Sequence, residues 1–161
     1  MTKSDTVSKA PAQTFAGQPL QQFLTYRLSR VQSKLNAQMA KILRENVGLT
    51  LMQWRVIALV GSAGQTRFSS LVKESVLDKG FLSRNLKTLI EQGFILSEPD
   101  QNDQRAQNLR LSPKGQNAFE RALPITQKRQ EWLRKDITED ELAVFRRVLD
   151  KLETASERQG F

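Results

Sequence analysis

The spacing of apolar side chains predicts two helices of different character in the first part of the chain. Apolar residues recur every three or four positions over residues 20–43, which predicts a long amphipathic helix with Pro19 in its first turn. Residues 51–60 are apolar on most sides and follow Thr50, a suitable N-cap, so they predict a buried helix that stops before Gly61. The amphipathic helix needs a partner surface to cover its apolar stripe.

The central part of the chain predicts two short helices. Residues 67–75 have an apolar inner side and a polar outer side, and they are too few to form a stable helix alone. The second helix begins after Asp78, a good N-cap, and ends at Gly93. Its apolar stripe faces one way, and the opposite face carries polar and charged side chains.

The period of the pattern then changes to two. Residues 94–97 and 108–111 are short β-prone runs joined by a polar stretch that contains Pro99 and Asp100, which predicts a β-hairpin with an extended tip. Two short helices followed at once by such a hairpin are the elements of a winged helix-turn-helix, whose second helix enters the DNA major groove. We therefore expect a mainly α fold with a small β-hairpin wing, of the α+β class.

Two further helices follow the hairpin. Ser112 and Pro113 open one by the cap-then-proline rule, and a capping box from Thr138 to Glu141 opens the last. The first helix and the last two carry more apolar surface than a small central lobe can cover, which favours burial against a second copy in a two-fold dimer. The expected parts are a disordered arm (1–18), a first dimerisation helix (19–49), a winged helix-turn-helix lobe (50–112) and C-terminal dimerisation helices (113–161), in one intertwined domain.

Composition adds mainly exclusions. The 161 residues include no His and no Cys, which excludes His- and Cys-based catalysis, Cys/His zinc sites and thiol redox sensing. A carboxylate-dependent hydrolase is the remaining enzymatic alternative, but no pair of inward carboxylates can be assigned to one cleft. We therefore expect no enzymatic activity, no cofactor and no metal. The longest apolar run, residues 56–60, is far too short to span a bilayer, and with no secretory signal we expect a cytoplasmic protein.

The charge of the chain indicates an anionic partner. The net charge is +8 and the isoelectric point about 10.1, which favours nucleic acid first and an acidic membrane surface second. The positive excess is concentrated in residues 1–61, whereas residues 62–115, which contain the predicted reading helix, are closer to balance. For DNA binding, the clustering of basic side chains on one surface matters more than the net charge of a segment.

Several stretches of the sequence resemble a known family. Residues 78–93, Asp-Lys-Gly-Phe-Leu-Ser-Arg-Asn-Leu-Lys-Thr-Leu-Ile-Glu-Gln-Gly, resemble the recognition helix of the MarR (multiple antibiotic resistance regulator) family. The predicted wing at 100–105, which leads into 109–115, and the segment 48–54 are similar to the same family, and the likeness covers about residues 20–155. The resemblance implies an intertwined homodimer that represses, or less often activates, transcription. It also implies release from DNA by a small, frequently aromatic, acid.

Arg84 is the residue that we expect to read a base. Its planar guanidinium can pair bidentately with the major-groove edge of guanine. The alternative is a surface arginine paired with Glu91 or Asp78. Ser83, Lys87 and Thr88 on the same helix are expected to contact phosphates, or bases through water, with a plain solvated face as the alternative. On the preceding helix, hydrogen bonds to phosphates are expected from Ser69, Ser70 and Lys73.

The predicted wing carries its own DNA-binding candidates. Arg105 lies where a wing tip enters an A·T-rich minor groove, whose negative potential attracts a guanidinium. Asp103, two residues earlier, is placed to orient it through a charge-assisted hydrogen bond. The alternative is a turn-forming Asp beside an unattached Arg.

Aromatic and basic side chains on the first two helices are candidates for an effector pocket: Phe23, Tyr26, Arg27, Arg30 and Trp54. The aromatic side chains supply an apolar wall, and either arginine can pair with a carboxylate. The alternative for Trp54 is a place in the core, which is the commoner position for such a side chain.

The sequence therefore favours a dimeric, sequence-specific transcriptional regulator. Its expected partners are double-stranded DNA with a pseudo-palindromic operator, a second copy of itself and a small-molecule effector, and the favoured mode is repression relieved by that effector. The alternative is a dimeric interaction or membrane-surface module that holds an acidic partner through its basic first helix without reading sequence.

Overall fold

The computed structural model describes residues 14–15, 18–75, 78–100 and 107–158. The chain divides into two compact units, residues 1–54 and residues 55–161. Helix α2 (Leu51–Ala63) spans the boundary between them.

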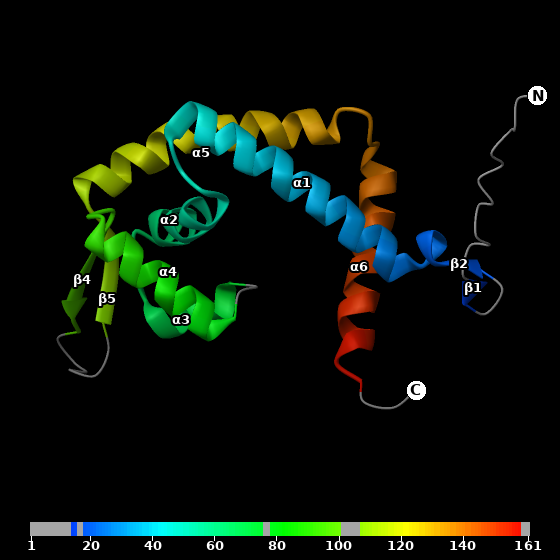
Figure 1. Cartoon of the computed structure of the whole chain (residues 1–161), viewed down its shortest axis with the longest axis horizontal. Helices are drawn as coiled ribbons and strands as arrows, with labels where there is room; N and C mark the ends of the chain where they lie inside the picture. Colours follow the sequence, from blue (N-terminus) through cyan, green and yellow to red (C-terminus); the bar gives the residue numbers. More distant parts are fainter. Residues whose placement is uncertain (1–13, 16–17, 76–77, 101–106, 159–161) are drawn as a thin grey trace, which may run out of the picture. The chain divides into compact units, whose positions relative to one another are not determined.

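The first unit is dominated by one long helix (Figure 1). Its elements are β1 (Thr14–Phe15), β2 (Gln18–Pro19), the 3-10 helix η1 (Leu20–Gln22) and α1 (Leu24–Val47). The antiparallel pair β1 and β2 lies at the end of the segment expected to be disordered. Pro19 was expected in the first turn of the long helix, and this is wrong: it precedes η1, and the extended backbone of Phe23 (φ −63°, ψ 133°) separates η1 from α1.

The ends of α1 and α2 are set by local signals. Helix α1 stops at Gly48, whose φ of 71° lies in the left-handed region that favours glycine. The backbone N–H of Gln53 donates to Thr50 Oγ1 (3.1 Å), and the N–H of Thr50 donates to Gln53 Oε1 (2.9 Å), so the expected cap is present in reciprocal form. The buried apolar side chains of this unit are Met39, Leu43, Leu49 and Trp54.

Helix α2 runs through Gly61 to Ala63, past the end that its glycine predicted. A Cβ at Gly61 would lie 2.8 Å from the ring of Phe119 and 3.0 Å from a methyl group of Leu111. The glycine therefore marks a close approach between helix α2 and its neighbours, and not the end of a helix.

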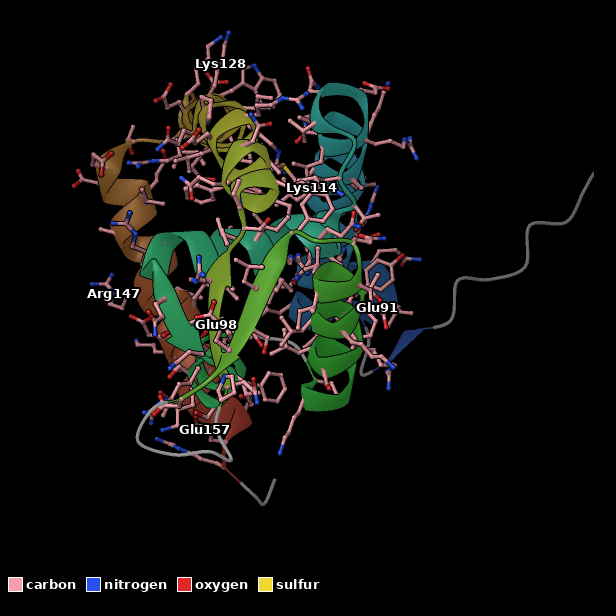
Figure 2. The ribbon with its side chains drawn as sticks, turned by 90° about the vertical axis from the view of Figure 1, so that its left-hand side faces the viewer. Glu91, Glu98, Lys114, Lys128, Arg147 and Glu157 are labelled. Atoms are coloured by element: carbon pink, nitrogen blue, oxygen red, sulfur yellow. The ribbon has the colours of Figure 1, made fainter. Side chains whose placement is uncertain are left out.

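The second unit contains two short helices and a three-stranded sheet. Its elements up to the sheet are β3 (Gln65–Arg67), α3 (Phe68–Glu74), α4 (Lys79–Glu91), β4 (Ile95–Pro99) and β5 (Gln107–Leu111). The strand order is β3-β5-β4, antiparallel throughout, with Thr66 and Ser97 both opposite Leu109 (Figure 2). The core is apolar, and its largest fully buried side chains are Val56, Ile57, Val60, Leu71, Leu82, Leu89, Ile95 and Leu109.

Two longer helices complete this unit, α5 (Pro113–Arg134) and α6 (Glu139–Ser156). The predicted capping box of α6 is present, and its hydrogen bonds from Thr138 lower the pKa of Glu141. Because the pKa of Glu141 is lowered in the folded protein, the cap contributes its full stabilisation of α6 at pH values above the ordinary pKa of a glutamate. This stabilisation is lost as the pH falls through the lower, folded-state pKa. Within the described residues, none of the helices combines the length and apolar character needed to cross a membrane.

The expected fold class, mainly α with a small β wing, is confirmed. The structure adds one strand, β3, that the sequence did not predict, because three residues are too few to show an alternating pattern.

Candidate nucleic-acid interface

Helix α4 has one face in the core and one face in solvent. Leu82, Leu86 and Leu89 are buried, and the N-cap Asp78 accepts a hydrogen bond from the backbone N–H of Phe81 at 2.9 Å. The predicted DNA-contacting side chains of this helix are all exposed: Ser83, Arg84, Lys87 and Thr88. The local sequence thus fixes the helix by its cap and stripe, and leaves these four side chains accessible to a ligand.

Arg84 is not held by the acids that the alternative interpretation named. Asp78 caps the helix, and Glu91 lies 3.8 Å from Lys87. The guanidinium carbon of Arg84 instead lies 6.0 Å from the ring centre of Phe81. The Lys87–Glu91 pair is exposed on both sides and therefore weak, so Lys87 can exchange it for a phosphate at small cost.

Thr88 is more restricted than the sequence suggested. Its hydroxyl donates to the backbone carbonyl of Arg84 at 3.1 Å. In this rotamer the oxygen can accept a hydrogen bond from a base amino group, whereas a phosphate, which has no proton to donate, would require the side chain to turn.

A groove of about 740 Å³ lies between α3, α4 and the strands of the hairpin. It brings together Ser69 from α3 with Ser83 and Lys87 from α4, beside Ser97 and Gln107 at the base of the wing. The rest of its lining is mainly apolar and consists of Phe68, Leu86, Ile90 and Leu109, with Arg67 and Glu91. The remaining predicted residues of α3 are placed elsewhere. Ser70 lines a second, polar groove, and Lys73 is exposed in the last turn.

The wing candidates Asp103 and Arg105 lie outside the described residues. The strands that carry the tip are cross-linked by side chains: Ser97 Oγ donates to Gln107 Oε1 at 3.0 Å. On the same strands, Arg110 forms a 2.7 Å ion pair with Glu98, which is labelled on the sheet in Figure 2.

Sequence reasoning missed a tighter contact at the start of the tip. The guanidinium of Arg67, at the end of β3, donates to Asp100 Oδ2 from Nε (2.9 Å) and from Nη2 (2.6 Å). Asp100 is only 6% exposed, so its carboxylate needs polar partners, and the Arg67 guanidinium is one of them. The two residues are separated by 33 positions, and no spacing rule connects them.

Removing this carboxylate is expected to cost stability. Asp100→Ala should lower the free energy of unfolding by about 1 kcal/mol, less than a fully buried charged hydrogen bond because the Arg67 side chain is 46% exposed. Urea denaturation measures the change. The matched control is Glu98→Ala, which breaks a pair of similar length between exposed side chains and should change stability by less than about 0.5 kcal/mol. Equal losses from the two variants would contradict the role given to burial.

The C-terminal end of α4 is clamped by the first turn of α5. Ser112 Oγ donates to the Gly93 carbonyl at 2.6 Å, and the Ser112 N–H donates to the Phe94 carbonyl at 3.0 Å. Lys114 Nζ donates to the Gln92 carbonyl at 2.7 Å and lies 4.3 Å from the Phe94 ring centre (Figure 2). We call this set of contacts the α4–α5 junction, and it ties the residues that follow α4 to the first turn of α5.

The predicted effector residues all belong to the first unit. Phe23 is half-buried at the start of α1, and Tyr26, Arg27 and Arg30 are exposed on its first turns. Trp54 is 8% exposed in α2, as a core side chain would be.

These elements define a winged helix-turn-helix protein. Residues 49–106 match the model of the MarR family. The MarR multiple antibiotic resistance protein of Salmonella typhimurium is 32% identical over 106 residues, which cover 65% of this chain and 73% of that protein. The chain therefore belongs to the MarR family of transcriptional regulators.

Solved structures agree with this assignment. A mutant MarR from E. coli complexed with operator DNA shares 26% identity at a TM-score of 0.65, covering 80% of this chain and 94% of that chain. A MarR/EmrR family transcriptional regulator from Acinetobacter sp. ADP1 has the same fold, with a TM-score of 0.75, 24% identity and coverage of 84% and 95%.

Proposed function

We propose that this protein is a homodimeric repressor that reads a pseudo-palindromic operator through α4. The observation that carries the proposal is the exposed face of α4, where Arg84 forms no ion pair with Asp78 or Glu91, on a helix fixed at both ends by its cap and by the α4–α5 junction. An accessible guanidinium on a fixed helix suits bidentate recognition of guanine. The related E. coli protein, solved with operator DNA, supports the same use of the fold.

The groove beside α4 supports contacts to the DNA backbone. Ser69, Ser83 and Lys87 converge there from two helices, and they are donors that suit phosphate oxygens. We propose that Arg105, oriented by Asp103, enters the minor groove beside the site that α4 reads.

Selection of bound duplexes from a random pool tests the proposal. A regulator should enrich one pseudo-palindromic sequence and prefer it over random duplex by about 10³-fold or more at physiological salt. The alternative module, using the exposed basic side chains of α1 such as Arg27 and Lys34, would bind all duplexes alike and respond only to salt. Absence of any enriched sequence would reject the regulator.

Dimerisation is proposed from apolar side chains left in solvent. Phe145 is 51% exposed on α6, where it lines a shallow apolar groove with Val144 and Val148. Burying such a face against a second copy removes this surface from water and places two copies of α4 on one duplex.

Phe145→Asp is accordingly expected to weaken the dimer. Placing a charge in the apolar contact should raise the dimer dissociation constant at least tenfold, as measured by sedimentation across a concentration series. Arg147→Ala, an exposed change on the same helix, is the control and should leave the dissociation constant nearly unchanged. A well-folded monomeric parent protein would refute the proposed assembly.

Release by an aromatic carboxylate is the proposed form of regulation, with Arg27 or Arg30 as the partner of the carboxylate and Phe23 and Tyr26 as aromatic side chains of the pocket. Trp54, at 8% exposure, is left to the core. A coupling of about 1–3 kcal/mol would lower DNA affinity 5- to 150-fold. Titrating a panel of aromatic acids into the protein–operator complex should identify a displacing ligand, whose effect should be lost in Arg27→Ala or Arg30→Ala. If both variants respond like the parent, the pocket is elsewhere.

A further inference from the structure

Phe81 is an aromatic side chain left in solvent on the helix that is proposed to read DNA. It belongs to the first turn of α4 and is 40% exposed, although the neighbouring Leu82 is completely buried. The buried stripe of α4 consists of other residues, Leu82, Leu86 and Leu89, and a large part of the Phe81 side chain stays accessible.

The ring lies on the proposed reading face. At 100° per residue, Phe81 is displaced by about 60° from Arg84 around the helix axis, on the side of Thr88, so it lies between Arg84 and the edge of the buried stripe at Leu89. The Arg84 guanidinium carbon lies 6.0 Å from the ring centre, so ring and guanidinium form one continuous surface. The Asp78 cap, bonded to the N–H of Phe81 itself, fixes the backbone that carries the ring.

The chemistry of the major groove restricts what such a ring can contact. Base edges there present hydrogen-bond donors and acceptors, and the one apolar group among them is the C5-methyl of thymine. The N-terminal residues of a recognition helix are those that contact base edges. An apolar ring beside a guanine-reading arginine therefore matches a thymine close to that guanine.

We propose that Phe81 is a specificity-determining residue that contacts a thymine methyl group within two base steps of the guanine read by Arg84. The spacing follows from the 6.0 Å between ring and guanidinium, compared with about 3.4 Å between successive bases of one strand. This inference rests on the proposed function, because it requires α4 to lie in the major groove.

The test uses the tightest duplex selected by the parent protein, in which each thymine is replaced in turn by deoxyuridine. This change removes one methyl group and leaves the hydrogen-bonding groups intact. At one thymine in each half-site, the parent should bind the modified duplex about fourfold more weakly than the unmodified duplex. This factor is the expected effect of burying one methyl group. Phe81→Ala should bind the unmodified duplex more weakly and show no further loss at that thymine.

Two variants separate this role from a structural one. Ile90→Ala removes another exposed apolar side chain from α4, in its last turn, and should keep the deoxyuridine profile of the parent. Phe81→Leu keeps an apolar surface and should retain part of the sensitivity. The salt dependence of Phe81→Ala should equal that of the parent, since no phosphate contact is lost.

The outcomes distinguish the inference from the proposed function. If the parent selects an operator but Phe81→Ala keeps the sensitivity to the methyl group, or if no thymine near the guanine responds, the role of Phe81 is wrong and the regulator stands. If the parent selects no sequence at all, the proposed function fails, and the inference fails with it.

Discussion

Gly115→Ala is expected to destabilise the protein by about 3 kcal/mol, although alanine is the better helix former. Gly115 is buried in the first turn of α5, and a Cβ there would overlap the backbone carbonyl oxygen of Phe94. Helix propensity favours alanine by up to about 1 kcal/mol, but overpacking against a backbone that cannot rotate away costs more. The same oxygen accepts the hydrogen bond from Ser112, so the substitution should also open the α4–α5 junction.

Urea denaturation measures the free energy of unfolding of this variant, and Asn117→Ala is the control. Asn117 is exposed on the same helix, so alanine there should leave stability unchanged or raise it by a few tenths of a kcal/mol. A stable Gly115→Ala protein with parental DNA affinity would show that the junction tolerates displacement and that its geometry is not needed for α4 to bind.

Arg84→Ala is expected to relax base preference at one position of each half-site, with a loss of about 1–3 kcal/mol there. The reason is that the Arg84 guanidinium faces an aromatic ring and not an acid, so its donors remain available to a base edge. Competition between the operator and duplexes altered at single positions measures the preference of parent and variant.

Lys87→Ala is the matched comparison on the next turn of the helix. Because a lysine at a phosphate acts as a point charge, its loss should weaken all duplexes alike and lower the slope of affinity against salt by about one. If Arg84→Ala leaves operator affinity unchanged in a folded protein, α4 does not have the reading role assigned to it.

The parts of the fold that the sequence predicted well are those encoded locally. Asp78, Ser112 and Thr138 each cap the helix that they were expected to cap, because a capping side chain bonds to a backbone group only three residues away. The order of the helices and the hairpin follows from the same local periodicity. The family was recognised from the likeness of residue runs, above all 78–93 and 100–105.

The features that the sequence did not predict depend on distant contacts. Strand β3 exists because it pairs with β5 more than forty positions later, and its three residues show no pattern of their own. Gly61 was taken as a helix end because glycine is a poor helix former, whereas close approach by Phe119 decides its identity. Arg67 and Asp100 meet only once the sheet has formed.

The candidate site shows the same division. The exposure of Arg84 and Lys87 follows from helical periodicity and could be predicted, whereas the partners of Arg84 could not. The aromatic and basic side chains of residues 23–30 are close together in sequence, but an effector pocket remains a prediction because it depends on how elements pack.

Because the α4–α5 junction holds α4 at its C-terminal end, a rotation of α5 would turn α4 about that end as a pivot. The helix has 13 residues, so its first turn stands about 20 Å from the contacts at Gly93 and Ser112. A tilt of α5 by about 10° about that pivot, carried through the hydrogen bonds, would move the first turn of α4 by about 3.5 Å and the backbone of Arg84, nine residues from Gly93, by about 2.4 Å. Both displacements are close to the length of a hydrogen bond, so a small rotation of a helix remote from DNA would be enough to take a guanidinium out of range of its base.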